Sequence, residues 1–133
     1  MWPYLDECLE YLSQYYEIVV FTAGEQNYAD SILDILDTDH LISQWLYRQH
    51  CICVDDWYYV KDLRIIKDWA LDKIVIVDNS IISFAYNMDN GVPCAAFYRW
   101  TKNDEEFLYL NSYLMELFHS DNVTTLNKEK FKL

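Results

Sequence analysis

Glycine, proline and basic residues are scarce in this sequence of 133 residues. It contains two Gly and two Pro, and a hydrophobic content of 53% excludes a low-complexity or disordered chain. Lys and Arg number 10 against 22 Asp and Glu, so the formal net charge is −12. Nucleic-acid binding needs a basic face, and this charge therefore argues for protein partners and against nucleic acid. We expect one folded domain over residues 1–133.

Long apolar runs and paired metal-binding cysteines are also absent. No run reaches the roughly 20 apolar residues of a membrane-spanning helix, and the first residues resemble neither a signal peptide nor a transit peptide. Four cysteines include no C-x-x-C pair, so neither a zinc site nor a thioredoxin motif is indicated. We expect reduced, mostly buried thiols in an intracellular protein.

Two apolar strands are each followed by polar residues. Four β-branched or aliphatic residues, 74–77, precede Asp78 and Asn79, as is typical of a parallel strand buried on both faces. Residues 17–24 repeat this pattern and end at Thr22 with a Gly turn. Ligands bind at the carboxyl ends of strands in open α/β sheets, so these polar residues are candidate site residues. The simpler alternative is that they form only turns, with Ser80 capping a helix.

The rest of the chain predicts helices around a parallel sheet and a small β insertion. Apolar spacing predicts helices over about 4–14, 27–36, 81–87 and 107–117, with a weaker helix over 121–133. Residues 92–97 predict a third parallel strand, and Asn103 with Glu106 has the form of a capping box. Aromatic and β-branched residues from about 41 to 60 predict the β insertion. The fold class is therefore α/β.

The polar groups at the predicted strand ends suit phosphoryl transfer. That reaction needs hydroxyl or amide donors, a cation such as Lys, and Mg²⁺ held by oxygen ligands. Thr22, Lys61 and the Asp78-Asn79 pair supply these groups. Each also has an ordinary explanation, such as a surface lysine for Lys61, and spacing alone does not decide between the two.

Six ordered motifs resemble those of the small C-terminal-domain phosphatases and Dullard-type phosphatases, the FCP-homology group of the haloacid-dehalogenase-like superfamily. They are Y-Y-E-I-V-V-F-T-A at 15–23, Y-A-D at 28–30, L-Y-R-Q-H-C at 46–51, Y-V-K-D-L at 59–63, I-V-I-V-D-N-S at 74–80 and D-N-G-V-P at 89–93. The resemblance covers nearly the whole chain. It implies a three-layer α/β/α Rossmann-like parallel sheet with a small β insertion. It also implies Mg²⁺-dependent removal of phosphate from phosphoserine or phosphothreonine, in a nuclear or cytoplasmic protein.

The resemblance assigns roles to four residues of the predicted site. Thr22 would hydrogen-bond the transferring phosphate. Lys61 would neutralise charge on the phosphate and on the nucleophile. Asp78 and Asn79 would hold Mg²⁺ directly or orient Lys61, and the resemblance leaves open which of the two is the direct ligand.

Two further residues match positions that shape the substrate groove beside the insertion. These are Tyr28 and Arg48. Their ordinary alternatives are a core aromatic for Tyr28 and a solvated insertion residue for Arg48. The resemblance implies a phosphoprotein as the substrate bound there.

The sequence departs from the family at the catalytic nucleophile. The family attacks phosphorus with the first Asp of a D-x-D-x-T or D-x-D-x-V motif, and the second Asp acts as general acid and base. That motif lies upstream of the helix at which this chain begins. Asp37-Thr38-Asp39 has the D-x-D form, but Leu41 replaces Thr or Val and no predicted strand precedes it, so we reject it. We expect the chain alone to be inactive and to lack one Mg²⁺ ligand.

This departure has a structural consequence. In the superfamily the nucleophile strand lies between the strand that ends at Thr22 and the strand that ends at Asp78. Without it each buried unpaired backbone group costs about 1–3 kcal/mol. We expect an upstream segment, a second copy or a partner protein to supply the strand. Two functions remain open: a phosphatase domain without its amino-terminal part, or an inactive protein-binding or structural subunit that keeps the fold.

Overall fold

The computed structural model describes residues 5–36, 40–78, 80–93 and 105–132. In chain order the elements, with η for a 3₁₀ helix, are α1 (Leu5–Ser13), β1 (Ile18–Phe21), α2 (Gln26–Leu36), β2 (Ile42–Leu46), η1 (Arg48–His50), β3 (Ile52–Val54), β4 (Tyr58–Val60), η2 (Leu63–Ile65), η3 (Leu71–Lys73), β5 (Ile76–Asp78), η4 (Ile81–Asn90), β6 (Gly91–Pro93), α3 (Glu105–Phe118) and α4 (Val123–Phe131). None of the helices in these ranges combines the length and the apolar character that a bilayer crossing requires.

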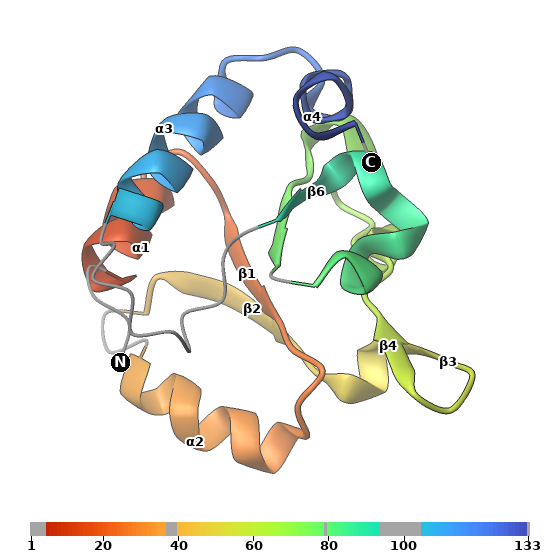
Figure 1. The fold of residues 1–133 in the computed structure, drawn as a ribbon. Helices are drawn as coiled ribbons and strands as arrows, with labels where there is room; N and C mark the ends of the chain where they lie inside the picture. Colours follow the sequence, from red (N-terminus) through yellow and green to blue (C-terminus); the bar gives the residue numbers. More distant parts are fainter. Residues whose placement is uncertain (1–4, 37–39, 79, 94–104, 133) are drawn as a thin grey trace.

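The strands form three separate two-stranded sheets. β1 pairs in parallel with β2, β5 pairs in parallel with β6, and β3 and β4 form an antiparallel hairpin. Helices and parallel pairs together confirm the predicted α/β class. No ladder joins β1 to β5 in the described strands, which agrees with the expectation that each of them lacks a neighbour (Figure 1).

β2 corrects the extent of the predicted insertion. Residues 42–46 were expected in the insertion, but they pair with β1, with Val20 opposite Trp45 and Phe21 opposite Leu46. The hairpin is therefore limited to residues 52–60, and its turn places Asp55 and Asp56 in the left-handed region at φ 55° and 60°. Aromatic and β-branched composition is the same in a main-sheet strand and in an insertion, so it could not separate the two.

The segment after β5 differs from the predicted α-helix over 81–87. η4 is a 3₁₀ segment with non-helical backbone at Phe84 and Asn87. Phe84 is fully buried, and the Asn87 side chain accepts a hydrogen bond from the Leu63 N–H at 2.9 Å. Ser80 stands at the N-cap position, but its side chain makes no capping hydrogen bond. Tertiary contacts therefore override the helical pattern of this segment.

Several sequence predictions lie partly or wholly outside the described residues. β6 contains residues 91–93 of the predicted strand over 92–97, and the remainder lies outside the described ranges. Asp37-Thr38-Asp39, Asn103 and the Glu106 side chain also lie outside what the structure describes. The predicted terminal helix is confirmed as α4, whose N-cap Asn122 accepts a hydrogen bond from the Thr124 N–H.

A hydrophobic cluster around α1 and α3 joins the two parallel pairs of strands. Its buried members are Cys8, Leu12, Val92, Tyr113, Leu114, Leu117 and Val123. Ile18 of β1 and Val75, just before β5, also pack against this cluster. The amino ends of β1 and β5 are thus fixed to the same helices, and side chains rather than a backbone ladder hold the two pairs together.

The burial of the strands and of the cysteines differs from the prediction. All four residues of β1 are only half-buried, and Val77 of β5 is 37% exposed. A parallel strand is buried on both faces when it has strand neighbours on both sides, and among the described strands β1 pairs only with β2 and β5 only with β6. Among the described cysteines, all of which are free thiols, Cys8 is buried, Cys51 half-buried and Cys53 exposed.

Candidate active site

A buried ion pair lies at the carboxyl end of β5. The Lys61 Nζ donates to the Asp78 Oδ2 at 2.6 Å, and the two side chains are 11% and 10% exposed. The Lys61 backbone N–H donates to the Ser83 carbonyl at 2.7 Å, which fixes the lysine between the hairpin and η4. The surface-lysine alternative for Lys61 is therefore wrong. A buried lysine with a carboxylate partner supplies the fixed positive charge that a phosphate site needs.

Asp78 also forms the turn that the simpler alternative proposed. Its Oδ1 accepts a hydrogen bond from the Ser80 N–H at 3.0 Å. One carboxylate thus holds the turn with one oxygen and Lys61 with the other. Asn79 lies outside the described residues, and its role stays a prediction.

Thr22 closes the turn after β1. Its N–H donates to the Leu46 carbonyl at 2.9 Å, and its Oγ1 accepts from the Gly24 N–H at 3.0 Å. The strand-end turn proposed for Thr22 is therefore present. Because Oγ1 is the acceptor in that bond, the hydroxyl hydrogen remains available for donation to an anion.

Cys51 lies beside the turn that follows β1. Its thiol lies 3.9 Å from the Thr22 carbonyl oxygen and 3.7 Å from the Tyr47 carbonyl oxygen. Burial raises the pKa of the Cys51 thiol, the charges of Lys61 and Arg48 lower it, and the charge of Asp78 raises it. No cysteine spacing pointed to this residue, and the L-Y-R-Q-H-C motif was its only signal in the sequence.

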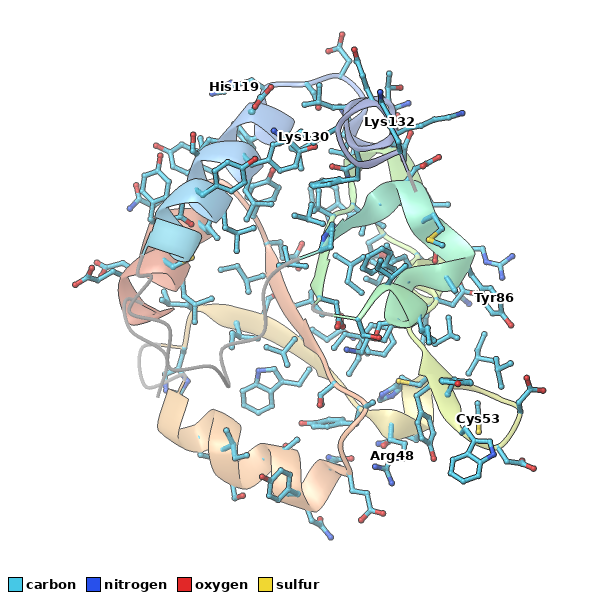
Figure 2. The ribbon with its side chains drawn as sticks, viewed as in Figure 1. Arg48, Cys53, Tyr86, His119, Lys130 and Lys132 are labelled. Atoms are coloured by element: carbon cyan, nitrogen blue, oxygen red, sulfur yellow. The ribbon has the colours of Figure 1, made fainter. Side chains whose placement is uncertain are left out.

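Arg48 is held by segments that are distant in the sequence. Its Nε donates to the Ala23 carbonyl at 2.7 Å, and its Nη1 lies 3.3 Å from a Glu25 carboxylate oxygen. The guanidinium carbon lies 5.0 Å from the centre of the Tyr59 ring. Figure 2 shows Arg48 below the hairpin that carries Cys53. The alternative of a merely solvated residue is wrong, because Arg48 ties the turn after β1 to the hairpin.

Tyr47 and Tyr28 flank this region in different ways. Tyr47 is buried, its hydroxyl donates to the Asp30 carboxylate, and its N–H donates to the His50 Nδ1 at 2.9 Å. Tyr28 is 69% exposed on α2, so its core-aromatic alternative is wrong. Within the described residues no hydrogen bond or ring contact joins Tyr28 to Arg48, and a common groove for the two stays a prediction.

The described residues do not form a complete Mg²⁺ site. Mg²⁺ requires near-octahedral oxygen ligation. Asp78 supplies one carboxylate, and both of its oxygens already have partners, in Lys61 and in the Ser80 N–H. In the part of the chain that the structure covers, no group of three or more His, Cys, Asp or Glu gathers that could hold a metal ion. Mg²⁺ binding would therefore need a further ligand.

Comparison with known proteins identifies relatives over nearly the whole chain. A family model described as NLI interacting factor-like phosphatase matches residues 1–124. CTD small phosphatase-like protein 2 of Dictyostelium discoideum is 36% identical over 132 residues, which cover 98% of this chain and 23% of the relative. CTD small phosphatase-like protein 3 of Caenorhabditis elegans is 41% identical over 114 residues, which cover 84% and 38%. Nuclear envelope morphology protein 1 of Saccharomyces cerevisiae is 32% identical, with coverage of 93% and 30%.

A solved structure has the same fold. The fission yeast RNA polymerase II CTD phosphatase Fcp1 matches with a TM-score of 0.60 and 21% identity, over 86% of this chain and 34% of that one. The chain spans 23%, 38% and 30% of the length of the three curated relatives. These matches confirm the resemblance inferred from the six motifs. The chain therefore belongs to the NLI interacting factor-like phosphatase family, which has the haloacid-dehalogenase-type α/β fold.

Proposed function

We propose that this chain forms the greater part of a protein phosphatase site for phosphoserine or phosphothreonine, and that it is inactive until another strand supplies the nucleophile. The observation that carries the proposal is the buried Lys61–Asp78 pair at the carboxyl end of β5. A lysine buried at the carboxyl end of a parallel strand has a ready function where phosphate charge must be neutralised.

The chemistry uses a carboxylate that the described residues do not provide. A carboxylate oxygen forms a bond to phosphorus while the bond from phosphorus to the Ser or Thr oxygen breaks. The leaving oxygen takes a proton from a second carboxyl group, which then removes a proton from water. That water splits the acyl phosphate, releases inorganic phosphate and regenerates the carboxylate. In both steps Lys61 would balance negative charge, and the Thr22 hydroxyl would donate to a phosphoryl oxygen.

Mg²⁺, when bound, would add charge neutralisation at the phosphoryl group. Asp78 is the described ligand for it, and we propose Asn79 as a second one. The incoming carboxylate would complete the set, because the described residues alone are insufficient. We propose a phosphoprotein substrate whose chain runs past Arg48 and Tyr28, and a nuclear or cytoplasmic location.

A second candidate function is a catalytically inactive protein-binding subunit. The hairpin favours it, because Trp57 is 81% exposed and Tyr58 and Ile52 are 48% and 39% exposed. Aromatic side chains are enriched at protein interfaces. On this alternative the fold would serve contacts with another protein, and the Lys61–Asp78 pair would be structural.

The test is hydrolysis of p-nitrophenyl phosphate with Mg²⁺ and with chelator. We would compare the chain alone with a fusion in which an amino-terminal apolar strand ending in D-x-D-x-T precedes it through a Gly-Ser linker. A fusion ending in N-x-D-x-T and an Asp78→Ala fusion serve as negative controls, and Asp55→Ala at the hairpin turn is a matched acidic control.

The proposal expects turnover from the D-x-D-x-T and Asp55→Ala fusions, and none from the chain alone or from either negative control. Mg²⁺-dependent turnover by the chain alone, lost on Asp78→Ala, would contradict the expected inactivity. Folded fusions that all remain inert would favour the protein-binding subunit.

A further inference from the structure

Three exposed aromatic side chains gather where α1 and α3 end. Tyr11 lies in the last turn of α1, Tyr15 follows that helix, and Phe118 is the last residue of α3. Their exposed fractions are 40%, 39% and 42%. The centre of the Tyr15 ring lies 5.5 Å from the centres of both the Tyr11 and the Phe118 rings. The three rings form one continuous surface, the aromatic face. Exposed apolar surfaces of this kind mark sites of interaction.

The aromatic face is fixed to the core. The Tyr16 ring lies 5.7 Å from the Phe118 ring, centre to centre, and the Tyr16 hydroxyl donates to the Leu114 carbonyl. Burial raises the pKa of this hydroxyl to about 12, so it keeps its proton and its hydrogen bond at neutral pH. The rings are therefore held in one arrangement before any partner arrives, which lowers the entropy cost of binding.

This surface lies away from the candidate active site. His119 contacts Phe118, with ring centres 5.3 Å apart. In Figure 2 His119 lies at the opposite end of the molecule from Arg48 and Cys53. A partner held beside His119 would therefore leave the candidate active site open.

The helices that carry the aromatic face have charge of one sign. α1 and α3 both contain acidic residues and neither contains Lys or Arg. Glu10 and Tyr11 follow Glu7 by three and four residues, so the exposed carboxylates of Glu7 and Glu10 share one side of α1 with the Tyr11 ring. Carboxylates beside the rings disfavour nucleic acid, an anionic membrane and a second copy of this acidic chain. They favour a basic segment of another protein.

Arginine combines the two properties that this surface can recognise. Its planar guanidinium stacks on aromatic rings and also pairs with carboxylates, whereas the compact, strongly hydrated ammonium of lysine has no such plane. Arg48 already makes this contact inside the protein, with its guanidinium carbon 5.0 Å from the centre of the Tyr59 ring. Among the residues that the structure describes, no Lys or Arg stands over a ring of the aromatic face in the same way.

We infer that the aromatic face binds an arginine-bearing segment of a partner protein. Guanidinium groups of that segment stack on Tyr11 and Tyr15 and pair with Glu7 and Glu10, and a neighbouring apolar side chain contacts Phe118. The inference goes beyond the proposed function and does not depend on it, because the surface is the same in an active phosphatase and in an inactive subunit.

The probe is a short fluorescein-labelled peptide of repeated Arg-Leu-Arg-Ser units. A second peptide replaces every Arg with Lys and keeps the charge. Fluorescence anisotropy measures both affinities at low and at high salt, because salt screens attraction between exposed charges and leaves stacking in place. Amide chemical shifts in NMR spectra identify the residues that contact the peptide.

Two variants test the ring itself. Tyr15→Ser removes the ring, and Tyr15→Phe keeps the ring without its hydroxyl. The matched control is Tyr86→Ser, at a tyrosine of η4 that is 50% exposed. We expect Tyr15→Ser to weaken binding of the Arg peptide about fivefold, and Tyr15→Phe and Tyr86→Ser to bind like the parent chain.

Two further variants test the carboxylates. Glu7→Gln with Glu10→Gln removes two charges beside the rings, and Asp55→Asn with Asp56→Asn removes two charges at the exposed hairpin turn. Both pairs lower the net charge equally, so a general attraction between an acidic chain and a basic peptide would weaken equally in both. We expect weaker binding at low salt from the first pair alone.

The inference further predicts that the Arg peptide binds about fivefold tighter than the Lys peptide at high salt, with shifts in residues 7–16 and 114–120. Four outcomes would overturn it: no binding, equal affinity for the two peptides at high salt, equal weakening by the two charge pairs, or shifts confined to the hairpin. A dimer of the free chain in sedimentation experiments that Tyr15→Ser dissociates would also overturn it, because a second copy would then occupy the aromatic face.

Discussion

Replacement of Lys61 by Met gives a direct measure of the buried ion pair. The pair has a 2.6 Å contact, and both side chains are about nine-tenths buried, at 11% and 10% exposed. Met keeps much of the apolar stem and removes the charge. Asp78 would retain its hydrogen bond from the Ser80 N–H but would lose its cation, so a buried carboxylate would remain without charge compensation.

The expected loss is large for a domain of this size. Removal of one partner from a buried ion pair costs about 3–5 kcal/mol. The total stability of a small domain is about 5–15 kcal/mol, so the variant would lose a substantial part of it. Replacement of both partners with apolar residues is often neutral or stabilising. The Lys61→Met, Asp78→Leu double variant should therefore be about 1–3 kcal/mol more stable than Lys61→Met alone.

Urea unfolding followed by tryptophan fluorescence measures these free energies. The matched control is Lys67→Met, which changes an exposed lysine in the loop after η2. Its free energy of unfolding should lie within about 0.5 kcal/mol of that of the parent chain. A Lys61→Met variant as stable as this control would refute the account of a buried, charge-compensated pair. The account would also be refuted if the double variant lost more free energy of unfolding than Lys61→Met and Asp78→Leu lose together.

Three further predictions concern the packing and titration of the core. A Cβ at Gly91 would lie 2.2 Å from the buried Phe84 ring, so Gly91→Ala should lower the free energy of unfolding by about 1–3 kcal/mol, and Phe84→Leu should partly rescue it in urea titrations. Asn127 is 1% exposed, and its side chain accepts a hydrogen bond from the Tyr113 hydroxyl at 2.6 Å and donates one to the Asp89 carbonyl at 3.0 Å. Asn127→Leu should therefore lower the free energy of unfolding by about 2–4 kcal/mol in the same assay. A loss below about 0.5 kcal/mol would contradict the importance of these contacts. Burial raises the pKa of Tyr113 from 10.0 to about 12, so its contribution to stability is complete below pH 10 and is lost as the pH rises to about 12. The unfolding temperature should fall less between pH 9 and pH 11.5 for Tyr113→Phe than for the parent chain. Equal falls would show that Tyr113 does not cause this pH dependence.

The strand ends of the site were predictable from the sequence because their signals are local. A run of apolar residues followed by Asp78 or Thr22 is visible along the chain, and the structure places both residues at the ends of β5 and β1. The burial of Lys61 was not visible, because it depends on η4 and β5, which follow it in the sequence. The contacts of Arg48 with Ala23 and Tyr59 were not visible either, because they join residues that are distant in the sequence.

The helices of the fold were predictable from the sequence, whereas one strand pairing and the geometry of η4 were not. Helical spacing identified α1, α2 and α3, whose apolar faces repeat along the chain. The parallel pairing of β2 with β1 was missed, because pairing depends on the path of the chain through α2 and not on the composition of residues 42–46. The 3₁₀ geometry of η4 was missed for a related reason, because the burial of Phe84 and the bond to Asn87 fix that segment from outside.

The junction of α1 with α3 has a consequence for the order of folding. The Cys8 thiol donates to the Asn111 side chain, 103 residues away, and the Tyr16 hydroxyl donates to the Leu114 carbonyl, 98 residues away. The hairpin and the two parallel pairs join much nearer segments, so their smaller loops should close first. The α1–α3 junction would then form after the rate-limiting barrier. Tyr16→Phe should accelerate unfolding and leave the refolding rate nearly unchanged in stopped-flow measurements, whereas slower refolding would show that the ends of the chain meet early.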